Sequence, residues 1–161
     1  MRSWKTKQGT NIYQLNCKGA YCYLFYMDGH SFLVDSGRKV ASKYLINALD
    51  RLTKGRGPDY LVQTHTHFDH SGNSYLIHKK YHAKIIVHRK EAGHLEQGEA
   101  PLPGGVNIPT RLLVWFGRTF SSLFRFPGVS ADIIVEKEEY QLPGIKGLLL
   151  LHTPGHSPGS L

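Results

Sequence analysis

Strand-like and helix-like hydrophobic patterns alternate along most of this chain, and that alternation restricts its possible folds more than any other feature. Three segments rich in Tyr, Phe, Val and Leu come first, at residues 12–16, 20–27 and 31–35. The dipeptide Asp28-Gly29, a frequent hairpin turn, separates the second segment from the third. We therefore expect an antiparallel meander of strands near the start of the chain.

A helical period follows the meander. Between residues 40 and 52, apolar side chains recur at spacings of three and four, which predicts an amphipathic helix. Its expected apolar face consists of Val40, Tyr44, Leu45, Ala48, Leu49 and Leu52. A second helix is expected at residues 73–81, and further strands at 60–63, 84–87, 133–136, 140–142 and 148–152. This order indicates the α/β (α+β) class, with helices layered on a sheet.

Residues 96–130 differ in character from the rest of the chain. Prolines and glycines border an apolar, helix-like stretch at residues 110–126. We interpret the segment as a helical or loop insertion near the substrate pocket, because insertions on a rigid scaffold often carry specificity. The alternative interpretation is that it packs against the parent domain.

Composition excludes several classes of protein. The 161 residues suit one domain, and the longest purely aliphatic run has four residues, far too few to span a membrane. The net charge of +8 comes from dispersed basic residues, so a solvated surface is expected and nucleic-acid binding is not favoured. Two cysteines, Cys17 and Cys22, are too few for a disulfide framework and are expected to be reduced. Without a recognisable secretory signal, a cytoplasmic location is expected.

Five of the ten histidines fall in two short segments. In an extended segment residues two apart point to the same side, so His65 and His67 can bind one ion. Asp69 and His70 follow after a bend and can present ligands to a second point close by. In the other segment, Pro and Gly form a tight turn that can aim His156 at the first cluster. Three imidazoles with an open position are typical of a catalytic metal ion, which lowers the pKa of water to about 7.

The remaining histidines are expected to have other roles. His152 is interpreted as a supporting residue that forms a hydrogen bond near the ligands. Ordinary structural roles are expected for His30, His78, His82, His88 and His94.

Three motifs, in this order and separation, resemble the metallo-β-lactamase superfamily: LVDSG at 33–37, THTHFDHSGN at 64–73 and HTPGHSPGS at 152–160. The resemblance implies an αββα sandwich with a metal site at the edge between two sheets. By the family pattern, His65, His67 and His156 would hold a first metal, and Asp69 and His70 would belong to a second. Asp35 would be a supporting acid near the ligands.

The resemblance also implies that further strands and metal ligands follow the third motif in family members. Family members continue with strands that carry a metal-bridging Asp or Cys and a final His, whereas only residues 157–161 follow His156. We expect a single domain over residues 1–161, incomplete at the C-terminus, with about the first half to two-thirds of the sandwich. Uncovered sheet edges would favour an oligomer or a complementary chain. Because the later ligands are missing, we expect these residues to bind about one zinc ion tightly and to hydrolyse substrates poorly.

The leading functional hypothesis is a metal-dependent hydrolase that cleaves an ester, thioester or lactone in a small-molecule substrate. The cofactor would be Zn²⁺, one or two ions, with Fe and Mn as alternatives. Asp69 would orient the attacking water and accept its proton. The alternatives left open are a phosphodiesterase or nuclease of the same superfamily, a mononuclear iron oxygenase, and a catalytically incomplete metal-binding fragment.

Overall fold

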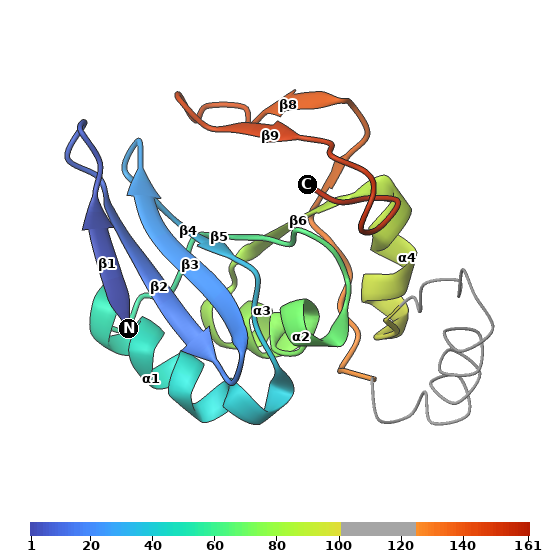
Figure 1. Ribbon diagram of the computed structural model, residues 1–161, viewed down its shortest axis with the longest axis horizontal. Coiled ribbons are helices and arrows are strands. Elements are labelled where there is room, and N and C mark those ends of the chain that lie inside the picture. Colours follow the sequence, from blue (N-terminus) through green and yellow to red (C-terminus); the bar gives the residue numbers. More distant parts are fainter. Residues whose placement is uncertain (101–124) are drawn as a thin grey trace.

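A computed structural model of the chain describes residues 1–100 and 125–161 (Figure 1). In this part of the chain, seven strands form one sheet in which the spatial order follows the sequence order. These strands are β1 (Arg2–Lys5), β2 (Asn11–Cys17), β3 (Ala20–Met27), β4 (His30–Val34), β5 (Tyr60–Val62), β6 (Lys84–His88) and β7 (Ile133–Val135). The first four pair antiparallel and β4 to β7 pair parallel. The mixed α/β class predicted from the sequence is therefore present.

The predicted meander is confirmed, with one further strand at its edge. Asp28 and Gly29 both have positive φ, at 50° and 78°, which is the backbone that a tight hairpin between β3 and β4 requires. The edge strand β1 was not predicted, because all four of its residues are exposed and carry no buried face. Edge strands of this kind leave no hydrophobic alternation to detect.

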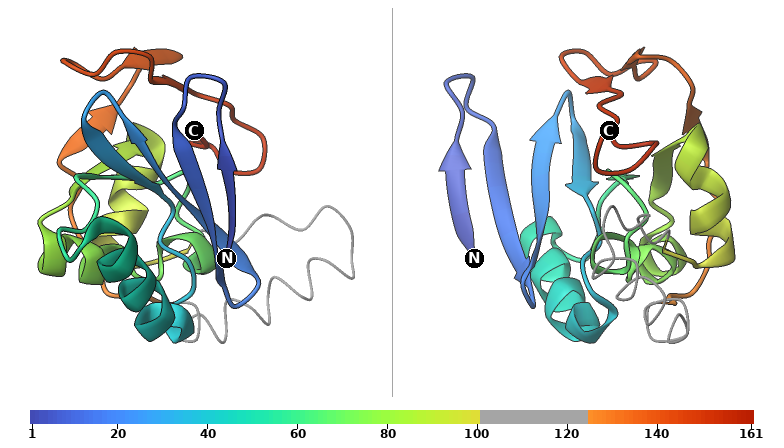
Figure 2. Two further views of the ribbon diagram at one scale, coloured as in Figure 1. Left: turned by 90° about the vertical axis from the view of Figure 1, so that its left-hand side faces the viewer. Right: turned by 45° about the vertical axis from the view of Figure 1, so that its right-hand side comes forward.

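Helices cover one face of the sheet. They are α1 (Ser42–Thr53), α2 (Phe68–Ser71), α3 (Ser74–Tyr81) and α4 (Arg89–Gln97), and a short 3-10 turn, η1 (Lys39–Ala41), precedes α1. The hairpin of β8 (Glu139–Gln141) and β9 (Leu149–Leu151) lies on the side of the sheet opposite α1, α2 and α3 (Figures 1 and 2). The sheet thus lies between a helical layer and a two-stranded second sheet.

Alternation along the parallel strands explains both layers. Leu61 and Ile85 point to the helical side, where Leu45 and Leu49 of α1 are fully buried. Their neighbours Val62 and Ile86 point to the other side, against Phe32, Leu142, Ile145 and Leu150. Each fully buried aliphatic side chain stabilises the fold by about 1.5–3 kcal/mol. The core therefore fixes the carboxyl ends of β4 and β5, from which the candidate site projects.

Two details of the predicted helix are wrong. Val40 is 76% exposed and Tyr44 is 40% exposed, although both were assigned to the buried face. Val40 lies in η1, where the three-residue turn breaks the α-helical period, and Tyr44 borders a surface hollow. The helix α4 was not predicted, and only its last two residues, 96 and 97, overlap the insertion proposed at 96–130. Most of that insertion lies outside the described residues.

Over the described ranges, we find no helix that combines the length and the apolar character needed to cross a bilayer.

Candidate metal centre

Three imidazoles from two distant segments converge in the structure. His65 and His67 follow the carboxyl end of β5, and His156 comes from the loop after β9. One ligand atom from each lies within 4.8 Å of the others, and among the described residues they are the group suited to hold a metal ion. The ring centroids are 4.6–4.8 Å apart, with the planes at 81–89° to one another. Near-perpendicular rings at this distance suit nitrogen atoms that face one common point.

A chain of hydrogen bonds fixes the protonation of His65. The Thr64 hydroxyl donates to both carboxylate oxygens of Asp35, at 2.9 Å each. Its oxygen lies 2.9 Å from Nδ1 of His65, so with its own proton committed it accepts from the Nδ1–H group. The Nε2 atom of His65 then carries a lone pair, and it is buried with no hydrogen-bond partner. A buried polar atom of this kind costs free energy unless a ligand satisfies it.

Electrostatics keep His65 neutral, as a metal ligand must be. Burial lowers the pKa of His65 to about 4, with contributions from the neighbouring His70, His67 and His156. Burial is the largest of these causes because it removes water from the charged form. Neutral imidazole with a lone pair on Nε2 is the form that binds a divalent metal.

The second segment is folded into a compact turn that carries His156. The Thr153 N–H donates to the Ser160 carbonyl at 2.8 Å, and the Leu161 N–H donates to the Thr64 carbonyl at 3.0 Å. The second bond joins this turn directly to the residue before His65. Nε2 of the exposed His156 consequently lies 3.1 Å from Nδ1 of His67.

Asp69 and His70 lie beside this group rather than within it. Both are in α2, and the His70 ring centroid is 4.1 Å from that of His65. Nδ1 of His70 is 2.8 Å from Oδ2 of Asp35, and its Nε2 is 3.8 Å from Oδ2 of Asp69. Burial lowers the pKa of His70, but the hydrogen bond with Asp35 and the negative charges of Asp35 and Asp69 together outweigh burial, so the net pKa is raised.

Asp35 supports both parts of the site from a buried position. Besides Thr64 and His70, its carboxylate accepts hydrogen bonds from Gln63 Nε2 at 3.1 Å and from the Thr64 N–H at 2.9 Å. Its φ of 59° is a left-handed conformation that Asp tolerates better than most residues. Sequence reasoning missed Thr64 and Gln63, which no short motif marks as partners of a residue 28 or 29 positions away.

His152 contacts the turn that carries His156. Its Nε2 atom lies 3.0 Å from the Pro158 carbonyl oxygen, which raises the pKa of His152, and its Nδ1 lies 3.1 Å from Glu138 Oε1. Its ring also stacks on His88 at 4.0 Å. The role of His152 as a support of the metal ligands therefore stays a prediction.

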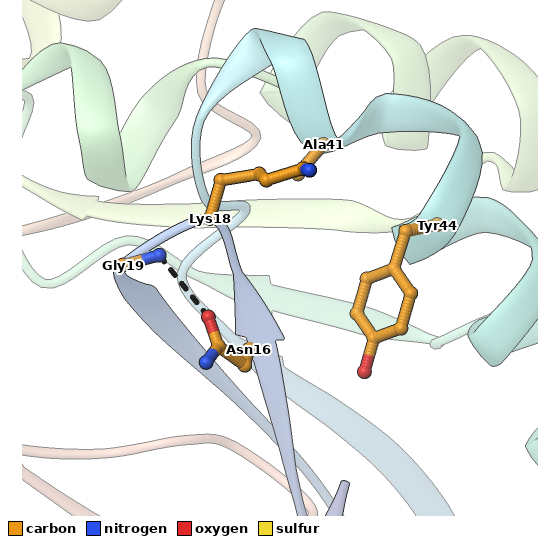
Figure 3. A pocket seen from close by; sticks show the side chains of 5 residues that line it. All are labelled: Asn16, Lys18, Gly19, Ala41 and Tyr44. Atoms are coloured by element: carbon orange, nitrogen blue, oxygen red, sulfur yellow. Dashed lines mark hydrogen bonds between the residues drawn. The ribbon is translucent and has the colours of Figure 1, made fainter.

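A surface hollow beside α1 offers a different kind of site. Asn16, Lys18, Gly19, Ala41 and Tyr44 line it, and the Gly19 N–H donates to Asn16 Oδ1 at 3.1 Å (Figure 3). Its lining contains no imidazole, thiol or carboxylate. The hollow therefore lacks the side chains that usually bind a transition metal. The three imidazoles, one of them with an unpartnered buried nitrogen, are suited to such an ion.

Comparison with known proteins agrees with this geometry. The family model described as the metallo-beta-lactamase superfamily matches residues 15–161. A probable metallo-hydrolase of Methanocaldococcus jannaschii, MJ0888, is 29% identical over 137 residues, which are 81% of this chain and 55% of that protein. The human acyl-coenzyme A thioesterase MBLAC2 is 32% identical over 111 residues, 66% of this chain and 37% of that protein.

Solved structures show the same fold. BJP-1, a subclass B3 metallo-β-lactamase of Bradyrhizobium japonicum, superposes with a TM-score of 0.70 at 24% identity. The match covers 92% of this chain and 51% of that one, and the predicted metallo-β-lactamase fold class is confirmed. The chain spans about half the length, or less, of these relatives.

Proposed function

This chain belongs to the metallo-β-lactamase superfamily, and on that premise we propose that it acts as a metal-dependent hydrolase. The bond cleaved is an ester, thioester or lactone, and an activated water molecule is the nucleophile. The observation that carries the proposal is the buried, unpartnered Nε2 of His65 within a group of three imidazoles.

The proposed metal ligands are His65, His67 and His156. Imidazole nitrogens and an open fourth position suit Zn²⁺, and metal analysis would separate it from Fe and Mn. A bound divalent ion supplies a Lewis acid that activates water at neutral pH and polarises the substrate carbonyl. In this assignment, the hydrogen bonds of Thr64 and Asp35 keep the His65 lone pair on Nε2.

Asp69 is the proposed general base. Its carboxylate is 38% exposed, so water and substrate can reach it, and it lies 3.8 Å from Nε2 of His70. It orients the attacking water and takes its proton as the new C–O bond forms. The proton then passes to the departing thiolate or alkoxide as the carbonyl carbon–heteroatom bond breaks. His70, held through Nδ1 by Asp35, is the proposed ligand of any second ion, with its Nε2 directed to the Asp69 side.

A thioester is the favoured substrate class. The human relative MBLAC2 is named an acyl-coenzyme A thioesterase, and its similarity to this chain supports that choice over lactones and simple esters. A reducing compartment such as the cytoplasm is supported by Cys17 and Cys22, free thiols whose sulfur atoms lie 3.5 Å apart.

A substrate panel tests this proposal. The chain loaded with Zn²⁺ would be incubated separately with an acyl-coenzyme A, an aryl ester, a lactone and an aryl phosphodiester, each beside the His67→Ala variant. Hydrolysis of the thioester that disappears in the variant is the expected result. Turnover of the phosphodiester alone would replace the proposal with a phosphodiesterase, and activity that survives His67→Ala would refute catalysis at this centre.

A further inference from the structure

Glu91 is a buried acid whose environment calls for an explanation. It lies in the first turn of α4, and its exposed fraction is 0%. Within residues 1–100 and 125–161 it forms no ion pair with Lys or Arg. Burying a carboxylate costs free energy unless hydrogen bonds compensate for lost water. Here burial alone would raise the pKa of Glu91, but hydrogen bonds from Thr66, Ser157 and Gly159 outweigh it.

The two carboxylate oxygens serve different segments of the chain. Oε2 accepts hydrogen bonds from the Thr66 N–H at 3.0 Å and from the Thr66 hydroxyl at 2.5 Å. Oε1 accepts from the Gly159 N–H at 3.0 Å. Thr66 stands between His65 and His67, whereas Gly159 is three residues beyond His156. One side chain therefore joins the two ligand-bearing segments.

Gly159 permits this contact through its lack of a side chain. A Cβ atom at this position would lie 2.6 Å from Cγ of Glu91 and 3.0 Å from Nδ1 of His88. Its φ is outside the left-handed region, so an alanine would meet these atoms without backbone strain of its own. The close packing of Glu91 thus requires a glycine at position 159. A substitution at either residue can therefore disrupt the contact.

We propose that Glu91 is a positioning residue that holds His156 at binding distance from His65 and His67. Because His156 lies on an exposed turn, its imidazole needs an anchor if the three nitrogens are to converge before the ion arrives. Glu91 supplies that anchor by binding the backbone on both sides of the centre. The inference rests on the proposed metal centre and adds a residue outside its ligands.

The test measures Zn²⁺ affinity of the full 161-residue chain by competition with a chromogenic chelator. Glu91→Gln keeps the size of the side chain but turns an amide N–H toward Thr66 or Gly159. Gly159→Ala leaves the charge in place and pushes Glu91 away. Glu96→Gln, the same change on an exposed position of α4, is the matched control. The melting temperature of each metal-free protein and the Co²⁺ absorption spectrum are recorded in parallel.

We expect both test variants to bind Zn²⁺ about 10–100-fold more weakly, as for other partners that orient metal ligands. The Co²⁺ absorption spectrum should change in both variants, whereas Glu96→Gln should bind Zn²⁺ as tightly as the wild type. Because both changes break the same contact, the double variant should bind Zn²⁺ no more weakly than whichever single variant binds it more weakly. A lower melting temperature with unchanged Zn²⁺ affinity would reduce Glu91 to a stabilising role and overturn the proposal. If Glu91→Gln does not fold, the Zn²⁺ affinity of Gly159→Ala alone tests the proposal.

Failure of the metal centre itself gives a different result. Wild-type protein that binds no Zn²⁺, or that binds it equally well after His67→Ala, would refute the centre and with it the role of Glu91. Tight, His67-dependent binding that neither Glu91→Gln nor Gly159→Ala weakens would refute the role of Glu91 alone.

Discussion

Replacing Asp35 with asparagine separates its hydrogen bonding from its backbone conformation. Asn has nearly the same shape as Asp and also tolerates the left-handed φ of 59°. It keeps one carbonyl oxygen, enough for Gln63 and Thr64, but turns an NH₂ group toward Nδ1 of His70. That imidazole must then give up its Nδ1 proton and carry its hydrogen on Nε2, where it blocks any role as a ligand.

The cost follows from the bonds that change. A hydrogen bond to a charged group contributes about 1.5–3 kcal/mol and a neutral one about 0.5–1.5 kcal/mol. Asp35→Asn replaces the charged bond from His70 with a neutral one of reversed direction and converts those from Gln63 and Thr64 into neutral ones. We expect the free energy of unfolding to fall by about 2–4 kcal/mol.

Urea denaturation of the metal-free protein measures this loss. The matched control is Asp28→Asn, at an exposed turn with a φ of 50°, where the expected change is below about 0.5 kcal/mol. Equal midpoints for the two variants would refute the account of Asp35 as a buried acceptor. Nitrogen-15 NMR of the His70 ring should show the hydrogen on Nε2 in Asp35→Asn.

Two further predictions concern stability. Gly37→Ala should destabilise the fold by about 1–3 kcal/mol more than Gly29→Ala, because both have positive φ but only at Gly37 would a Cβ lie 2.4 Å from Cys17 Cβ; equal midpoints in thermal denaturation would contradict it. Hydrogen bonds from Lys80 and Tyr81 lower the pKa of Asp50, so the stability they contribute is present above the unfolded pKa, near 4, and is lost as the pH falls through the lower folded pKa. Asp50→Asn should flatten that part of the stability–pH curve, and an unchanged acid limb would count against the interaction.

Much of the scaffold could be predicted from the sequence because its signals are local. The meander, α3 and the parallel strands follow from periodicity within short windows, and the convergence of His65, His67 and His156 was expected from spacing and turn chemistry. Leu61 and Ile85, for example, lie in segments that were predicted to be strands, and both side chains are buried in the core.

What could not be predicted depends on contacts between distant residues. Val40 matches the helical period of the sequence, but it lies in the 3-10 turn η1, where its side chain is exposed. The helix α4 contains so few apolar residues that its periodic pattern is weak. Glu91 reads as an ordinary surface acid, because its partner Gly159 is 68 positions away.

The central claim is that three imidazoles form a metal centre, and the most direct test is the Zn²⁺ content of the purified chain. Metal analysis after exhaustive dialysis should find about one Zn²⁺ per chain in the wild type and almost none in His67→Ala. Equal metal content in the two proteins, or none in either, would contradict the claim.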